Sequence, residues 1–267
     1  MTSDSAAVRL TGVRLERGGR AVLEAIDLVV PRGSVTAVLG PSGSGKSTLL
    51  AALTGELAPA AGTVEVLGQP VPQAKRALLA LRKGMGVLLQ GNGLLTDLTA
   101  AENVALPLRT HTDLPDAVVR RLVAMKLHAV GLRAAADLFP RELSGGMARR
   151  VALARALALD PPLMIYDEPL TGLDPIASGV IMSLIARLNA SLGLTSIIVT
   201  HHVHETLPVA DRAVVIANGR IVFSGTPAEL QGSDDALVRQ FLRGEPDGPI
   251  PFDSAARERA PHAAEPA

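Results

Sequence analysis

Cysteine is absent from this chain of 267 residues, tryptophan is absent too, and aromatic residues make up only 2% of it. Without cysteine there can be no disulfide bond and no thiolate metal site, which suits a reducing compartment. Because aromatic side chains are so scarce, leucine, valine, isoleucine and alanine must fill the core, and a hydrophobic share of 48% is large enough for that. The length allows one large α/β domain or a domain with a subdomain.

The chain also lacks an excess of charge of either sign, since Lys+Arg and Asp+Glu both number 26. Proteins that bind nucleic acid normally carry a basic excess, so we expect no nucleic-acid partner. No run approaches the ~18 apolar residues of a transmembrane helix, and the N-terminus has no basic segment followed by an apolar one. We therefore expect a cytosolic chain that reaches a membrane only through a partner.

Apolar patterns along the chain predict an α/β fold with a helical insert. Runs rich in β-branched residues predict strands at "SVTAVLG", "GTVEVLG", "GMGVLLQ", "PLMIYDEP", "TSIIVTHH", "RAVVIANG" and "RIVFSG", and shorter alternating strands precede them. From about Gln90 to Asp160 the patterns are helical, with no convincing strand. Beyond Gly232 the sequence predicts a short helix at "DDALVRQFL", an extended "PDGPIPF" and a disordered tail.

One glycine-rich stretch, "GPSGSGKST", has the spacing of a phosphate-binding loop between a strand and a helix. Its glycines, Gly40, Gly43 and Gly45, let the backbone turn sharply and direct successive N–H groups at phosphate oxygens. Lys46 would add a positive charge for the β- and γ-phosphates, and the Ser47 hydroxyl would bind Mg²⁺. The predicted ligands of this loop are therefore the β- and γ-phosphates and Mg²⁺, and the remaining residues of the predicted loop are Pro41, Ser42, Ser44 and Thr48.

Two acidic residues end the apolar run "LMIY", where a buried parallel strand would stop. Asp167 is predicted to bind Mg²⁺ through water, and Glu168 to polarise the water that attacks the phosphate. Alone, such a pair is more often two solvated carboxylates at a strand end. The phosphate-binding loop in the same chain favours the catalytic interpretation.

A second anion pocket is predicted at "ELSGGMARR", far from the first. Ser144 is a good N-cap, and Gly145 and Gly146 expose backbone amides at the start of a helix. Ordinary helix capping is the commoner use of such a serine. What favours the anion pocket is the set of motifs that accompany it.

"LSGGM" occurs together with "GPSGSGKST", "MIYDE", "GLDP" and a histidine that closes "IIVTHH". Over nearly its whole length the chain resembles the nucleotide-binding subunit of ABC transporters. The resemblance implies a P-loop NTPase (RecA-like) parallel-sheet core with an antiparallel β subdomain, a helical insert and a short C-terminal extension. It also implies a head-to-tail homodimer, in which Ser144, Gly145 and Gly146 of one copy hold the γ-phosphate of ATP bound to the other.

The same resemblance implies further roles for single residues. Gln90 would contact Mg²⁺ and sense the transport subunit, and Asp174 would line the dimer interface. His201 would hold the γ-phosphate and position the attacking water. The domains implied are an ATP-binding α/β core at 1–89 and 161–231, a helical subdomain at 90–160 and an extension at 232–267.

Two positions depart from the family pattern. Where the family usually has an aromatic residue that stacks on adenine, this chain has Arg17, whose guanidinium plane can also stack on a base. Where an aspartate usually follows the switch histidine, this chain has His202. With His204 it could form a metal-binding pair, but two histidines without another evident ligand are more often surface residues.

The less general stretches resemble the ATPase of the Mla phospholipid-transport system. They are "LPLRTHTDLP", "MKLHAVGLRAAADLFPRELSGGMARR", "DPIASGVIMSLI" and "VRQFLRGEPDGPIPF". This implies work with a transmembrane permease, an MCE-domain lipid-binding protein and a STAS-domain protein, at the cytoplasmic face of the inner membrane. We further expect "GNGLLTDL", after Gln90, to form the groove for the permease, and "DGPIPF" to pack on a protein surface such as the second protomer.

Other interpretations predict features that this sequence does not have. A non-transport ABC ATPase acting on DNA or ribosomes would show a basic face, a long coiled-coil insertion or two ATPase units. A catalytically inactive subunit would lack Lys46, Glu168 or His201, and a phosphate-loop kinase would leave "LSGGM" unexplained. An ATPase of an amino-acid or lipoprotein transporter remains the close alternative.

Overall fold

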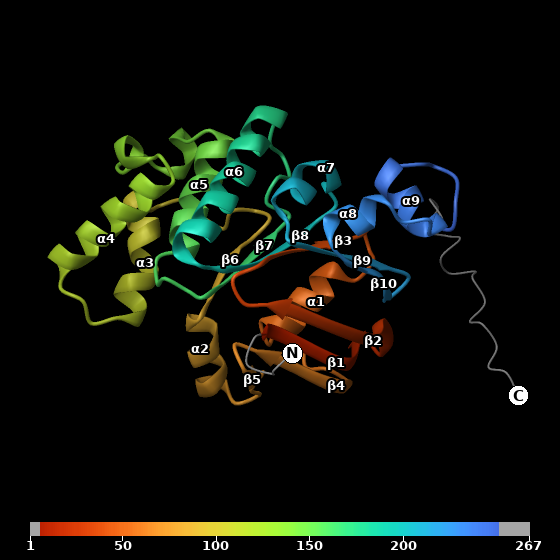
Figure 1. Cartoon of the computed structure of the whole chain (residues 1–267). Helices are drawn as coiled ribbons and strands as arrows, with labels where there is room; N and C mark the ends of the chain where they lie inside the picture. Colours follow the sequence, from red (N-terminus) through yellow and green to blue (C-terminus); the bar gives the residue numbers. More distant parts are fainter. Residues whose placement is uncertain (1–5, 251–267) are drawn as a thin grey trace, which may run out of the picture.

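The computed structural model describes residues 6–250, and this part of the chain forms two β-sheets and a layer of helices (Figure 1). The larger sheet has six strands in the order β10-β9-β3-β8-β7-β6. These are β3 (Val35–Leu39), β6 (Met85–Leu88), β7 (Leu163–Asp167), β8 (Thr195–Thr200), β9 (Arg212–Ala217) and β10 (Arg220–Gly225). The smaller, antiparallel sheet has the order β2-β1-β4-β5, formed by β1 (Ala6–Arg17), β2 (Arg20–Pro31), β4 (Ala61–Val66) and β5 (Gln69–Pro70).

The larger sheet is parallel except at one edge. Strands β9, β3, β8, β7 and β6 pair in parallel, as expected, whereas β10 runs antiparallel to β9. The expected parallel core is therefore confirmed, with one antiparallel strand added at its edge. The reason is local, because Asn218 and Gly219 both have positive φ, 50° and 74°, which suits the tight turn of a β-hairpin.

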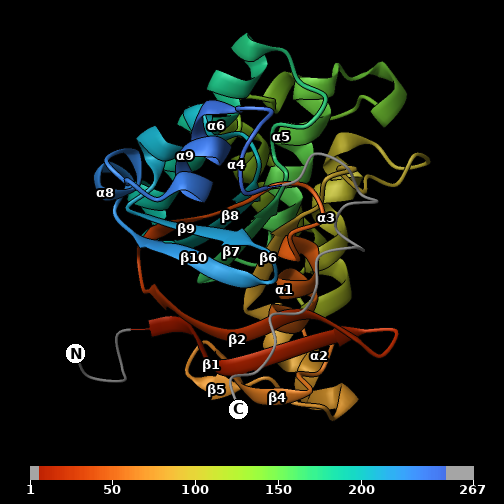
Figure 2. The same cartoon turned by 90° about the vertical axis from the view of Figure 1, so that its right-hand side faces the viewer.

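Helix α1 (Lys46–Leu53) lies between the two sheets (Figure 2). Its Leu49 and Leu53 are fully buried and belong to one apolar cluster with residues of both sheets. Because α1 packs against both sheets, it joins them into one core. The glycine-rich loop that precedes α1 is thereby fixed between β3 and the core.

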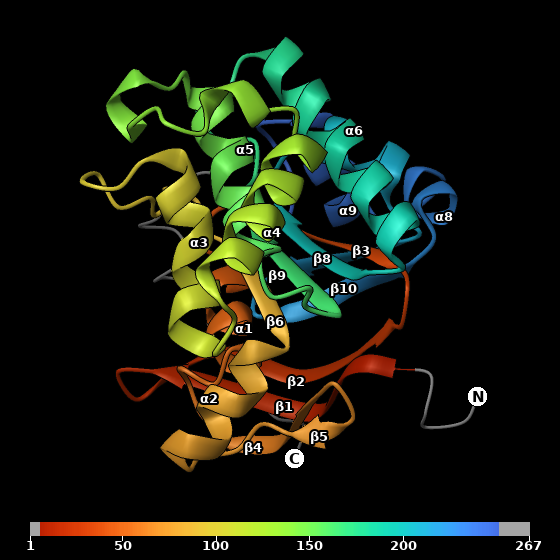
Figure 3. The same ribbon diagram turned by 90° about the vertical axis from the view of Figure 1, so that its left-hand side faces the viewer.

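Three helices of residues 90–160 form a layer on the other side of the larger sheet (Figure 3). They are α3 (Ala100–His111), α4 (Asp116–Ala129) and α5 (Gly145–Ala156), with 3-10 turns at Arg133–Ala135 and Pro140–Glu142. Thr99 and Glu102 start α3 with a reciprocal capping box. The prediction that this segment contains no strand is confirmed, and its assignment as a separate subdomain stays a prediction.

Among the described residues one helix, α6 (Pro175–Leu192), is long and apolar enough to cross a membrane by length and composition alone. The core helix of a globular protein passes the same test. Ile181, Ile185 and Leu188 of α6 are buried in the cluster shared by the helical layer and the larger sheet. Helix α6 passes this test because its polar residues are uncharged apart from Arg187.

The remaining helices are α2 (Lys75–Lys83), α7 (Val203–Thr206), α8 (Pro227–Gln231) and α9 (Ala236–Arg243), with a 3-10 turn at Leu207–Val209. Helix α9 confirms the helix predicted at "DDALVRQFL". The buried Gln240 side chain then ties down the following loop, since it accepts from Ile250 N at 2.7 Å and donates to Ile250 O at 3.0 Å. The tail predicted to be disordered and the last two residues of "DGPIPF", Pro251 and Phe252, lie outside the described residues.

Candidate functional site

The carboxyl ends of four neighbouring parallel strands meet at one edge of the larger sheet. Leu39 at the end of β3 pairs with Thr200 at the end of β8, and Val199 of β8 pairs with Asp167 of β7. Tyr166 of β7 in turn pairs with Leu88 of β6. The residues predicted from separate motifs therefore follow four adjacent strands. A ligand of an open α/β sheet binds at this kind of edge.

Two glycines of the loop after β3 allow an approach that no side chain would permit. A Cβ on Gly40 would lie 2.2 Å from the carbonyl oxygen of Ile216, and Gly40 has a φ of 155°. A Cβ on Gly45 would lie 2.6 Å from Leu23 Cδ2, at a φ of 103°. The next residue, Lys46, begins α1 with no side-chain cap and no acid in the first turn. Its amides and helix dipole suit an anion.

Lys46 is held over the loop by the loop itself. Its Nζ donates to the carbonyl oxygens of Gly40, at 2.7 Å, and Pro41, at 3.0 Å. Burial lowers the pKa of Lys46, against the opposing attraction of Glu168 and Asp167. Ser44 Oγ is buried in the same loop without a hydrogen-bond partner among the described residues. A buried cation, an unpartnered hydroxyl and an uncapped helix start fit a polyphosphate.

Arg17 lies against the same loop. Its Nε donates to Thr48 Oγ1 at 3.2 Å, so the guanidinium is next to the start of α1. This position is compatible with the adenine contact that the family resemblance implies for Arg17. The contact itself stays a prediction.

Glu168 adopts a backbone conformation that is unusual for a residue with a side chain. Its φ is 47°, in the left-handed region, and its N–H donates to Val199 O at 2.8 Å. The side chain is held at both oxygens: Thr200 Oγ1 donates to Oε2 at 2.9 Å, and His201 Nδ1 lies 2.9 Å from Oε1. The structure thus brings together the predicted base and the predicted switch histidine.

Thr200 is a site residue that sequence reasoning missed. It is fully buried, and besides holding Glu168 its Oγ1 accepts the N–H of His202 at 3.0 Å. Its position directly before "HH" was the available signal. A threonine inside a β-branched strand is ordinarily assigned to the sheet alone.

The acidic side of the site suits Mg²⁺. Burial, and next the charge of Glu168, raise the pKa of Asp167, while Lys46 opposes this. A cation bound near Asp167 would relieve that repulsion. The carboxylate of Asp167 and the exposed hydroxyl of Ser47 are oxygen donors of the kind that Mg²⁺ prefers. Gln90 follows β6 and is exposed. Its backbone carbonyl accepts a hydrogen bond from Arg149.

Two arginines of α5 hold the loop that contains Gln90. Arg149 Nη1 donates to Leu89 O at 3.0 Å and to Gln90 O at 2.9 Å, and its Nη2 donates to Thr171 O at 3.1 Å. Arg155 donates to the carbonyls of Asn92 and Gly93. Burial lowers the pKa of both guanidinium groups. Sequence reasoning missed these contacts because arginines on a helix usually face solvent.

The second predicted pocket lies in the helical layer. Ser144 is exposed and caps α5, since its Oγ accepts from Met147 N at 3.2 Å. Asp174 caps α6 in the same way, through Ile176 N and Ala177 N at 2.9 Å each. The two helix starts are neighbours, because a Cβ on Gly146 would lie 3.5 Å from Ala177 Cβ. Helix α1 packs instead against β1, β2 and β4, so the two anion pockets occupy different layers.

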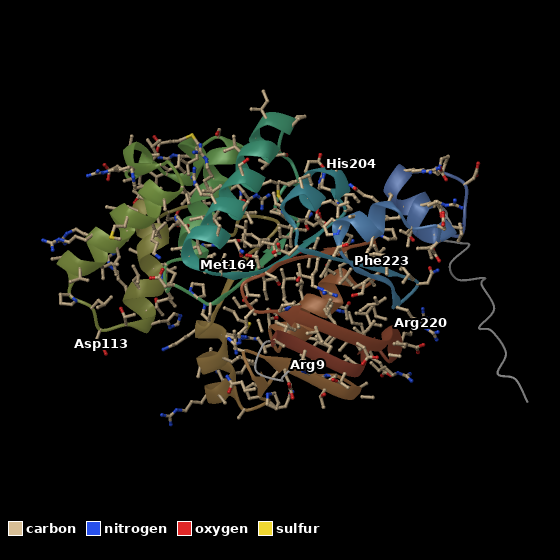
Figure 4. All side chains as sticks on the ribbon, in the orientation of Figure 1. Arg9, Asp113, Met164, His204, Arg220 and Phe223 are labelled. Atoms are coloured by element: carbon tan, nitrogen blue, oxygen red, sulfur yellow. The ribbon has the colours of Figure 1, made fainter. Side chains whose placement is uncertain are left out.

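The structure groups His202 with Glu168 and His201. His204 is exposed on α7, at the outer surface (Figure 4). His202 is half-buried, and its ring centroid lies 4.4 Å from that of His201. His202 therefore lies against His201, and it has no predicted role in hydrolysis.

Comparison with known proteins places the chain among ATP-binding transport proteins. Residues 23–171 match the family model described as ABC transporter. The chain is 49% identical over 252 residues to the intermembrane phospholipid transport system ATP-binding protein MlaF of Haemophilus influenzae, covering 94% of this chain and 96% of that protein. It is also 49% identical to MlaF of Escherichia coli K12, covering 92% and 91%.

Solved structures agree with the fold. The structure of cbiO1 from Clostridium perfringens, part of the ABC transporter complex cbiONQ, has a TM-score of 0.81 at 29% identity and covers 90% of this chain and 96% of that one. A dimeric post-hydrolysis state of the ATP-binding cassette MJ0796, bound to ADP and Pi, has a TM-score of 0.75 at 30% identity, covering 82% and 98%. With its phosphate-binding loop, acidic strand end and switch histidine at one sheet edge, the chain belongs to the ABC transporter family of ATP-binding proteins.

Proposed function

We propose that this chain is the ATP-hydrolysing subunit of a transporter that moves phospholipid between the inner membrane and a periplasmic MCE-domain lipid carrier. The observation that supports this cargo is the 49% identity to the MlaF proteins over more than nine-tenths of the chain. That span includes the helical insert and reaches into the C-terminal extension. These are the regions in which ATPases with different cargoes differ most, whereas the motifs at the sheet edge are common to all of them.

The chemistry follows from the residues at the sheet edge. The loop amides and Lys46 bind the phosphates, which requires Lys46 Nζ to leave the carbonyls of Gly40 and Pro41 for phosphate oxygens. Glu168 accepts a proton from the attacking water, and Thr200 keeps its carboxylate in one orientation. His201 orients the γ-phosphate. Mg²⁺, held by Ser47, Asp167 and Gln90, would supply positive charge for the β- and γ-phosphates.

Two copies are needed to complete each nucleotide site in this proposal. The pocket formed by Ser144, Gly145 and Gly146 begins α5, and Ser144 and Gly145 are exposed, so it is available to a second copy. A head-to-tail pair would bring the two pockets of different chains to one ATP. Asp174, which starts α6 beside this pocket, would then lie at the interface.

The permease would bind at the loop between β6 and α3. Leu89 and Leu95 there are 50% and 47% exposed, which gives an apolar surface on a backbone that is otherwise held firmly. The buried Asn103 side chain accepts from Leu95 N at 2.9 Å and donates to Leu95 O at 3.0 Å. The arginines of α5 hold the other half of the loop. A rigid apolar loop beside Gln90 is suited to passing movement between permease and nucleotide site.

The remaining partners follow from the same assignment. An MCE-domain protein would receive or deliver the lipid, and a STAS-domain protein would bind the ATPase. The chain would then sit at the cytoplasmic face of the inner membrane, attached through the permease. Ile250, tied to Gln240, belongs to the stretch "DGPIPF" that would pack on a protein surface such as the second protomer.

The test is to purify the intact complex through this subunit and identify its lipids and proteins by mass spectrometry. We expect phospholipid, a permease and an MCE-domain protein in stoichiometric amounts, and ATP-dependent transfer of phospholipid after reconstitution. The control complex carries Lys46→Ala and should assemble without transferring lipid. Recovery of a permease for amino acids or lipoproteins, with no phospholipid transfer, would contradict the proposed cargo.

A further inference from the structure

We propose that Glu168, His201 and His202 form a binding site for a divalent transition-metal ion of the zinc class, and that this ion inhibits the ATPase. One ligand atom from each of the three side chains lies within 4.8 Å of the other two. No cysteine is available to the chain, so two imidazoles and a carboxylate are its best donor set for such an ion. Binding of the ion does not depend on the proposed function, whereas the inhibition does.

The three side chains need only small rotations to surround an ion. In tetrahedral zinc sites the metal lies about 2.0–2.2 Å from each nitrogen or oxygen, so neighbouring ligand atoms are separated by roughly 3.3 Å. His201 Nδ1 and Glu168 Oε1 are 2.9 Å apart. The rings of His201 and His202 have centroids 4.4 Å apart and are tilted by 34°. The backbone can therefore stay in place.

The residue behind the cluster orients its ligands. Thr200 Oγ1 donates to Glu168 Oε2, which leaves Oε1 directed at His201. The same hydroxyl oxygen accepts the N–H of His202, which fixes the backbone that carries the second imidazole. Metal sites depend on such outer hydrogen bonds to orient the groups that bind the ion. Thr200 itself is fully buried at the end of β8, so this support is rigid.

The donor atoms of the cluster favour a transition metal over Mg²⁺. Imidazole nitrogen suits zinc, nickel, copper and cobalt, whereas Mg²⁺ is bound by oxygen. Asp167 adds negative charge near Glu168, and Lys46 adds positive charge near both carboxylates. Three protein ligands leave a further position for water. His201 is 47% exposed on its side chain, so an ion can enter from solvent.

Inhibition follows from which groups the ion would occupy. Glu168 could no longer accept a proton from water, and His201 could no longer face the γ-phosphate. His202 has no part in the proposed hydrolysis, so its removal should abolish metal binding without removing catalysis. This separation makes the proposal testable with a single substitution.

The experiment titrates Zn²⁺ into the full-length chain without nucleotide, by isothermal calorimetry, with Co²⁺ absorption as a second readout. We expect one ion per chain and the intense visible bands of tetrahedral Co²⁺. His202→Asn should weaken binding by roughly tenfold or more and remove the bands. Loss of a residue that only hydrogen-bonds to a ligand typically costs at least about tenfold in metal affinity, and loss of a ligand itself should cost no less. The matched control, His204→Asn, should behave like the wild type.

The ATPase is then measured with Mg-ATP in excess and free Zn²⁺ set by a chelator. Zn²⁺ should inhibit the wild type and His204→Asn but leave His202→Asn close to its own uninhibited rate. Equal Zn²⁺ affinity in the wild type and His202→Asn, or Co²⁺ spectra of octahedral type, would overturn the metal site while leaving the proposed function intact. A wild type that binds the ion but hydrolyses no ATP would instead overturn the proposed function.

Discussion

Glu168 combines a strained backbone with a fully oriented side chain. A left-handed φ of 47° costs a non-glycine residue about 1–2 kcal/mol, and the surrounding hydrogen bonds to Val199, Thr200 and His201 maintain it. Strain of this kind at a strand end is typical of a functional position. This backbone conformation places the carboxylate beside His201, at the sheet edge where the phosphate-binding loop follows β3.

Replacing Glu168 with Gln should remove hydrolysis and leave ATP binding. The amide keeps the size of the side chain but is a far weaker base, so turnover should fall about 100-fold or more. ATP should then remain bound and hold two copies together, which size-exclusion chromatography with ATP can detect. Glu56→Gln, at an exposed position after α1, is the control. Unchanged turnover in Glu168→Gln would exclude Glu168 as the base.

Asp167 should be unfavourable for stability and necessary for function. Burial and the neighbouring Glu168 raise its pKa, so the charged form is disfavoured in the folded chain. Stability therefore falls as the pH rises from the ordinary carboxyl value of 3.8 to the raised pKa, and the full loss is present above that pKa. Asp167→Asn without nucleotide should raise the melting temperature at pH 7 by about 2 °C and reduce ATPase activity.

The stabilisation by Asp167→Asn should disappear as the pH falls toward 3.8, where the wild-type carboxyl becomes protonated. Calorimetric melting curves over this range provide the measurement. A variant that melts below the wild type at neutral pH would mean that attraction to Lys46 outweighs burial.

At the scale of elements, helix α5 connects the two predicted sites. Its first residues form the second anion pocket, and its buried Arg149 holds the carbonyls of Leu89, Gln90 and Thr171. One helix therefore contacts the loop after β6, the segment after Glu168 and the region offered to a second copy. A shift of α5 would move all three together. Coupling between permease and nucleotide site needs such a rigid connecting element.

Arg149→Leu should loosen the loop that contains Gln90. Three carbonyl oxygens would lose a charged donor, at a cost of about 1–3 kcal/mol for each that stays buried without a partner. We expect faster hydrogen exchange of residues 89–93 and lower ATPase activity. The matched control is Arg150→Leu, because Arg150 is on the same helix but donates to Val130 O instead. Equal exchange in both variants would contradict this role.

The described residues form two sheets and a helical layer, and the two predicted anion pockets lie in different parts of this arrangement. The phosphate-binding loop begins α1, between the sheets, whereas Ser144 begins α5 in the helical layer (Figure 2). Because the core of each layer is closely packed, one chain cannot fold its second pocket onto its first. A complete site that uses both pockets therefore needs two chains.

Mixed dimers test this arrangement. With Lys46→Ala and Ser144→Arg on separate chains, one of the two composite sites stays intact, so turnover should reach up to about half of the wild type. With both substitutions on one chain and a wild-type partner, each site has one defect and turnover should be lost. Two affinity tags allow each mixed dimer to be purified and assayed. Equal activity of the two arrangements would rule out the composite site.

The candidate phosphate-binding loop could be predicted because the residues proposed to bind phosphate are contiguous. Nine residues, 40–48, contain the glycines, the lysine and the hydroxyl, and their conformation depends mainly on neighbours in the chain. The strand before the loop and the helix after it also follow from local periodicity. The edge strand β10 was placed less well, since its direction depends on a two-residue turn rather than on its own apolar pattern.

Residues 40–48, 167–168 and 201 could be assigned to phosphate chemistry from the printed sequence, because each motif has its chemistry within a few neighbouring positions. The contacts of Thr200 and His201 with Glu168, and of Arg149 with the loop after β6, could not. These contacts join segments that are 30 or more residues apart or that face each other only after β8 enters the sheet between β3 and β7. Strand order results from packing of the whole core, and no local pattern specifies which strand ends become neighbours.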